Sequence, residues 1–88
     1  MKIALICTDK PGHLDTRLSN RDAHVAYLKE TGVDQAGPFL NEHGEMAGSL
    51  IILDVADMAA AQAWAAQDPY AKAGLFSDVR LEIWNKVI

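Results

Sequence analysis

The 88-residue sequence is poor in cysteine, in positive charge and in long apolar runs. Its single cysteine, Cys7, cannot form an internal disulfide, which favours a reducing compartment, so we expect a cytoplasmic protein. Eight Lys and Arg stand against 12 Asp and Glu, and no basic cluster is present, which argues against nucleic acid or an anionic membrane as partner. No apolar run approaches the roughly 20 residues that span a bilayer, and the apolar start is too short for a signal peptide.

The sequence also lacks the motifs that bind metal ions and nucleotide cofactors. It contains no Cys-x-x-Cys, no His-x-x-x-His and no glycine-rich phosphate loop. His13 and His43 fall in polar segments without partners at metal-ligand spacing. Cys7 lies in an apolar segment, which favours a small buried hydrophobe over a nucleophile. We therefore expect neither a metal nor a cofactor.

What is present is an alternation of strand and helix patterns that fits one domain over residues 1–88. Strands are predicted at 2–7, 33–39, 46–55 and 79–87, and helices at about 15–31 and 57–67. Gly32 is expected to end the first helix, Gly37-Pro38 to end the second strand, and Asp57 to cap the second helix. The order βαββαβ is that of ferredoxin-like folds. Right-handed crossovers then place two helices on one face of a four-stranded antiparallel sheet, an α+β architecture.

The first and third predicted strands are apolar on both faces, which two helices on one face cannot cover. In the first strand one face carries Ile3, Leu5 and Cys7, and the other carries Ala4 and Ile6. In the third strand one face carries Leu50 and Ile52, and the other carries Ile51 and Leu53. A strand of this kind is typical of a sheet buried on both faces. An exposed apolar patch marks an interface, so we predict a homodimer packed sheet against sheet.

A polar ridge interrupts the first predicted helix. Arg21 lies in the middle of the apolar arc, and Arg17 and His24 flank it at spacings i, i+4 and i+7. One interpretation is that the arginines extend to solvent at the sheet edge and His24 is a satisfied boundary histidine. The other is an anion-binding or acid-base site, because such groups are costly to desolvate without partners. We expect Arg21 to be largely buried and hydrogen-bonded.

Asp68 and Ser49 each allow a structural and a chemical interpretation. Asp68 precedes Pro69, a pattern typical of an N-cap with proline in the first helical turn. The same carboxylate can cap with one oxygen and accept an imidazole N–H with the other, fixing the tautomer of His24. Ser49 follows Gly48 and is either a small residue that permits close packing or a hydroxyl that faces a ligand.

Several segments resemble the YCII-related (YciI-like) family, in the same order and over nearly the whole chain. They are RLSNRDAHVAYL (17–28), GPFL (37–40), AGSLIILDV (47–55), AQAWAAQDPYAKAGLF (61–76) and VRLEIWNKV (79–87). The Arg-x-x-x-Arg-x-x-His and Asp-Pro-Tyr motifs make the resemblance specific. It implies ferredoxin-like subunits joined through their sheets into a dimeric α+β barrel. It also implies an active site at His24 and Asp68, with Arg17, Arg21, Ser49 and Tyr70 as neighbours that contact substrate.

Two functions remain open at the level of sequence. The first is an enzyme in which His24, oriented by Asp68, is the general acid/base on a small anionic or aromatic molecule. The resemblance includes a dehydrochlorinase of a chlorinated hydroxyquinol, and isomerisation or elimination needs a base but no metal. The second is a non-catalytic dimer that binds a metabolite, since this fold hosts many functions.

Overall fold

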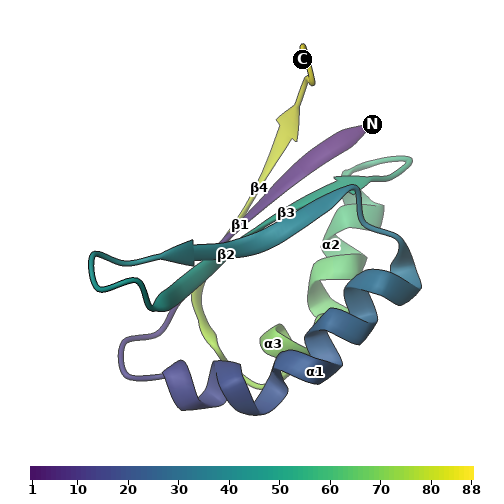
Figure 1. The fold of residues 1–88 in the computed structure, drawn as a ribbon. Helices are drawn as coiled ribbons and strands as arrows, with labels where there is room; N and C mark the ends of the chain where they lie inside the picture. The colour runs from purple at the N-terminus through teal and green to yellow at the C-terminus, as the bar shows by residue number, and fades with distance from the viewer.

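The computed structural model describes residues 1–88, and its elements follow the predicted order. They are β1 (Lys2–Asp9), α1 (Leu14–Thr31), β2 (Gln35–Leu40), β3 (Met46–Asp54), α2 (Met58–Gln67), α3 (Pro69–Lys72) and β4 (Phe76–Trp84). The strands form one antiparallel sheet in the order β2-β3-β1-β4. All helices lie on one face of this sheet (Figure 1), so the predicted ferredoxin-like α+β fold is confirmed. None of the helices is long and apolar enough to cross a membrane.

The hydrophobic core lies between the sheet and α2. Its fully buried members come from the central strands and from one helical position: Ile3, Leu5, Cys7, Ile51, Leu53 and Ala61. Met58, Trp64 and Ala65 of α2 pack against this cluster. Asp57 caps α2, because its side chain accepts a hydrogen bond from the backbone N–H of Ala60 at 2.8 Å.

The ends of α1 agree with the prediction, but its buried face does not. Gly32 ends the helix in the left-handed conformation (φ 71°, ψ 51°), which glycine adopts without a side-chain clash. The buried residues of α1 are Arg17 and His24, whereas Leu18 is 51% exposed. The helix therefore meets the rest of the protein partly through polar side chains.

The second strand does not end at Gly37-Pro38, contrary to the prediction. β2 continues to Leu40, and Pro38 lies opposite Ser49 of β3. β2 is an edge strand, so the missing N–H of a proline can face the unpaired side of the sheet. The strand ends instead at the turn formed by residues 41–45.

The sheet face opposite the helices carries no other element of the chain (Figure 1). Ala4, Ile6, Leu50 and Ile52 lie on this face, since they alternate with the core residues of β1 and β3. Ile6 pairs with Leu50 and Ala4 with Ile52 across the two central strands. The structure thus has an apolar strip at the centre of its uncovered face.

Candidate active site

The short α3 begins at the Asp-Pro pair, and this fixes the position of Asp68. The residue has extended backbone angles (φ −60°, ψ 125°) between α2 and α3, and Pro69 occupies the first turn of α3. Its Oδ1 atom accepts the backbone N–H of Tyr70 at 3.0 Å, which is the predicted N-cap. The side chain is only 1% exposed, so the cap holds a carboxylate inside the protein.

His24 of α1 meets this carboxylate. Its Nδ1 atom lies 2.8 Å from Oδ1 of Asp68, the same oxygen that caps α3. The sequence analysis expected one carboxylate oxygen to cap α3 and the other to contact His24. In the structure Oδ1 does both, and Oδ2 is buried without a hydrogen-bond partner. A carboxylate accepts hydrogen bonds, so this contact suits the tautomer of imidazole with its proton on Nδ1, in which Nε2 is the basic atom.

Tyr70 holds the plane of the His24 ring. The two rings are stacked, with centroids 3.9 Å apart and planes 15° from parallel. The guanidinium of Arg17 lies 4.6 Å from the Tyr70 centroid. Arg17 and His24 are two helical turns apart, about 10 Å along α1, so the Tyr70 ring lies between them. Burial raises the pKa of the Tyr70 phenol, so this side chain is uncharged at neutral pH and does not act as a base.

Arg17 is held by Asp9, a residue that the sequence analysis did not select. The guanidinium donates to both carboxylate oxygens of Asp9, through Nε at 2.7 Å and Nη2 at 2.8 Å. Nη2 also donates to Oγ of Ser49 at 2.9 Å. Burial lowers the pKa of Arg17, but the Asp9 carboxylate outweighs it, and the pKa stands above its ordinary value. The signal that could have found Asp9 is its place at the end of β1, beside the start of α1.

Arg21 corrects the prediction made from the helical arc. Its side chain is exposed and makes no hydrogen bond or ion pair within the chain, whereas Arg17, placed on the flank, is 2% exposed. The arc was misplaced because it was drawn through Leu14, Leu18, Val25 and Leu28, and Leu18 is 51% exposed. Arg21 is therefore a cation without a partner at the site.

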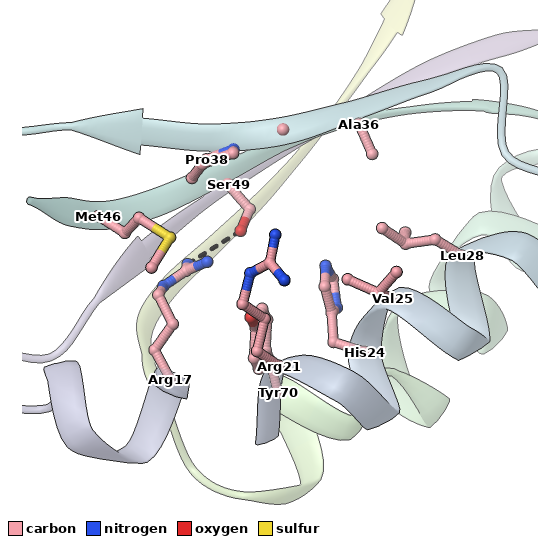
Figure 2. A pocket seen from close by; sticks show the side chains of 11 residues that line it. Arg17, Arg21, His24, Val25, Leu28, Ala36, Pro38, Met46, Ser49 and Tyr70 are labelled. Atoms are coloured by element: carbon pink, nitrogen blue, oxygen red, sulfur yellow. Dashed lines mark hydrogen bonds between the residues drawn. The ribbon is translucent and has the colours of Figure 1, made fainter. Parts of the chain in front are cut away.

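A cavity of about 130 Å³ lies between α1 and the strands β2 and β3 (Figure 2). In Figure 2 the Arg21 guanidinium and the His24 ring reach into this space below the sheet. The polar lining is formed by Arg17, Arg21, His24, Ser49 and Tyr70, and the rest by Val25, Leu28, Ala36, Gly37, Pro38 and Met46. A cavity of roughly 150 Å³ holds a benzene molecule, so this one suits a single ring.

The chain therefore brings together five of the predicted site residues at one cavity, and Asp68 lies directly behind His24. No group of three or more His, Cys, Asp or Glu side chains is placed to hold a metal ion. Burial raises the pKa of the Cys7 thiol to about 12, and this residue lies in the core and not in the cavity lining. The site thus offers an imidazole, a hydroxyl and an unpaired guanidinium.

Sequence comparisons find relatives over nearly the full length of the chain. The model of the YCII-related domain matches residues 1–85. An uncharacterised protein of Haemophilus influenzae is 35% identical over 97 aligned residues, covering 99% of both chains. Protein YciI of Escherichia coli O6:H1 is 36% identical over 97 aligned residues, again covering 99% of both.

Several solved structures resemble the fold. The 5-chloro-2-hydroxyhydroquinone dehydrochlorinase TftG of Burkholderia phenoliruptrix AC1100, solved with 2,5-dihydroxybenzoquinone, superposes with a TM-score of 0.89. It is 30% identical, and the match covers 97% of this chain and 94% of that one. An antibiotic biosynthesis monooxygenase, at a TM-score of 0.61 and 15% identity over 99% and 98% of the two chains, is similar in fold alone. The match to residues 1–85 and the full-length relatives show that the chain belongs to the YCII-related domain family.

Proposed function

We propose that the protein is a cofactor-independent enzyme in which His24 is the general acid/base and Asp68 orients it. The observation that carries this proposal is the 2.8 Å contact between Nδ1 of His24 and Oδ1 of Asp68, behind a cavity that His24 lines. A carboxylate on Nδ1 fixes the tautomer and leaves Nε2 free to take a proton. Tyr70 and Cys7 are not available as bases at neutral pH, because burial raises the pKa of both side chains and keeps them protonated.

The substrate class that fits the cavity is a hydroxylated aromatic molecule or a similar small anion. The cavity has room for about one ring, and its apolar side chains can contact the two ring faces. Arg21 is the unpaired cation at its lining and can bind a deprotonated hydroxyl. The likeness to TftG, which was solved with 2,5-dihydroxybenzoquinone, supports the same class of ligand.

The reaction type that needs only these groups is isomerisation or elimination. Nε2 takes a proton from a ring hydroxyl, and the oxygen's electron pair moves into the ring. In an isomerisation the imidazolium returns the proton to a ring carbon. In an elimination the imidazolium gives this proton to the ring carbon that bears the leaving group. A second ring hydroxyl then loses its proton to Nε2, and its electron pair moves through the ring and expels the leaving anion, chloride for a chlorinated ring. The products are a quinone and chloride, and the imidazolium passes the remaining proton to water. Neither route requires an oxidant, a reductant or a metal.

We also propose that two copies pack through the uncovered sheet face. Ala4, Ile6, Leu50 and Ile52 form an apolar strip on that face, and no element of the chain covers it. Ala4 and Ile52 are already only 8% and 5% exposed, so a second copy would remove from water mainly the apolar surface of Ile6 and Leu50, at about 25 cal/mol per Å². Since the cavity lies on the helix side of the sheet, each copy would keep its own site.

The experiment that tests the catalytic proposal measures chloride released from 5-chloro-2-hydroxyhydroquinone under nitrogen. We expect release well above the buffer rate with the wild-type protein, and a loss of about 10²- to 10⁴-fold with His24→Gln. His43→Gln is the matched control, because His43 lies in the exposed turn before β3 and outside the cavity. If the wild-type protein binds 2,5-dihydroxybenzoquinone but releases no chloride above buffer, it is a metabolite-binding dimer instead.

A further inference from the structure

The hydroxyl of Ser49 accepts a hydrogen bond within the chain but donates none. Its Oγ atom accepts a hydrogen bond from Nη2 of Arg17 at 2.9 Å. A serine hydroxyl also has one O–H to donate, and none of the hydrogen bonds within the chain uses it. Ser49 is 2% exposed and lines the cavity, so the unpaired O–H belongs to a buried group beside the space for a ligand.

Arg17 prevents the hydroxyl from reversing these roles. A guanidinium has only donors, so Oγ of Ser49 must accept from it. Arg17 itself is fixed on two sides, by the two hydrogen bonds to Asp9 and by its position against the Tyr70 ring. The side chain of Arg17 is 2% exposed and that of Asp9 7%, so water does not compete for the pair.

We propose that Ser49 is a specificity-determining donor, which binds an acceptor oxygen of the ligand, and that Asp9 and Arg17 are positioning residues that hold its hydroxyl in the donating state. The inference rests on the proposed function, and it adds a requirement on the ligand. The ring must carry a carbonyl or phenolate oxygen at the position next to Ser49, in addition to the group that faces His24. A ligand with a hydrogen-bond donor or a C–H there leaves the buried hydroxyl unpaired and binds more weakly.

The assignment separates the two arginines of α1. Arg17 has its charge balanced by the Asp9 carboxylate and acts on the ligand through Ser49. Arg21 has no such partner and remains available to a negative charge on the ligand. The cavity therefore recognises two different oxygens, a charged one at Arg21 and an acceptor at Ser49.

The test uses 2,5-dihydroxybenzoquinone as the probe, with affinity measured by calorimetry and the C–O stretching bands of the bound probe by infrared spectroscopy. We expect Ser49→Ala to weaken binding about 10- to 100-fold and to move one C–O band to higher frequency, because a donated hydrogen bond lowers it. Ser49→Thr keeps the hydroxyl and should restore both. Ser19→Ala makes the same change on the exposed side of α1 and should alter neither. Asp9→Asn should move the same C–O band to higher frequency by part of the shift seen with Ser49→Ala. In a protein that already carries Ser49→Ala, adding Asp9→Asn should not move the band further.

The outcomes distinguish this proposal from the one on which it rests. If the wild-type protein binds the probe and Ser49→Ala binds it equally, with unchanged bands, Ser49 is not a donor, while the roles of His24 and Asp68 stand. If the wild-type protein does not bind the probe, the ligand class is wrong and both proposals fail. Should Ser49→Ala not fold, Ser49→Cys replaces it, because a thiol of similar shape is only a weak donor.

Discussion

One oxygen atom of Asp68 accepts two hydrogen bonds, from the backbone N–H of Tyr70 at 3.0 Å and from Nδ1 of His24 at 2.8 Å. The atom that starts α3 is therefore the atom that sets the tautomer of the imidazole. The residue that it caps, Tyr70, stacks on the same imidazole. The position and orientation of His24 are thus tied to the start of a four-residue helix.

Asp68→Asn should separate the chemical role of this residue from its structural one. Asparagine caps a helix about as well as aspartate, so we expect the free energy of unfolding to change by less than about 1 kcal/mol. The capping oxygen is also the one that faces Nδ1, so the amide keeps its oxygen there but lacks the negative charge that stabilises the imidazolium formed when Nε2 takes a proton, and chloride release should fall about 10²- to 10⁴-fold. Chemical denaturation and the chloride assay measure the two effects.

The matched control is Asp57→Asn, the same change at the N-cap of α2. Asp57 does not line the cavity and does not contact His24. We expect both the stability and the rate of this variant to stay near those of the wild-type protein. Equal rates for the two variants would leave Asp68 as a helix cap without a part in the chemistry.

Arg21→Gln should weaken the binding of anionic ligands without loss of stability. The side chain is exposed and makes no hydrogen bond within the chain, so its removal costs little on folding. A charge-assisted hydrogen bond contributes about 1.5–3 kcal/mol, so the dissociation constant of 2,5-dihydroxybenzoquinone should rise about 10- to 100-fold. Lys29→Gln removes the same charge from the last turn of α1, outside the cavity, and serves as the control. Calorimetry in low salt would contradict the role of Arg21 if both variants bind alike.

The sequence was sufficient for the fold and for the local structure around Asp68. Strand and helix periods, the glycine at the end of α1 and the Asp-Pro pair are local signals, and each acts over a few residues. The prediction that the second strand ends at Gly37-Pro38 was wrong, because the cost of proline in a strand depends on whether the strand lies at the edge of the sheet. That property comes from the sheet order, which places β2 outermost.

The buried face of α1 could not be predicted from hydrophobic spacing. Arg17 and His24 are buried because Asp9, Asp68 and Tyr70 provide their partners, and two of these are more than 40 residues from His24 along the chain. A hydrophobic arc assigns polar residues to the surface, and only tertiary partners reverse this. The prediction selected Arg21 as the buried arginine only because it lies in the middle of the arc, whereas the structure buries Arg17, which has a partner in Asp9.

Ile6→Asp should disrupt the proposed dimer. Ile6 lies on the uncovered sheet face, and an unpaired carboxylate buried in an apolar interface costs several kcal/mol. Light scattering of the wild-type protein at micromolar concentration should give twice the mass of one chain, and the variant should be monomeric or insoluble. Leu18→Asp places the same charge on a 51% exposed leucine of α1, on the helix side, and should remain dimeric. A wild-type protein with the mass of one chain would rule out the sheet-to-sheet dimer.

Cys7 should make the stability of the protein fall at high pH. Burial raises the pKa of its thiol from an ordinary value of 9.0 to about 12 in the folded state. Since the folded pKa is the higher one, the neutral thiol stabilises the fold fully below pH 9, and this contribution is lost as the pH rises from 9 to 12. The unfolding free energy of the wild-type protein should fall relative to Cys7→Ala by up to about 1.4 kcal/mol per pH unit above pH 9. Urea titrations between pH 8 and 10.5 measure the unfolding free energy of each protein. The prediction would be wrong if this free energy changed with pH by the same amount in both.

The most direct test of the central claim is a crystal structure of the wild-type protein with 2,5-dihydroxybenzoquinone. We predict that the ring lies in the cavity between α1 and β3, with one oxygen about 3 Å from Nε2 of His24. The contact between Nδ1 and Asp68 should persist in the complex. A ligand bound elsewhere, or one that lies in the cavity with no atom in hydrogen-bond or single-water reach of Nε2, would contradict the role of His24 as the acid/base.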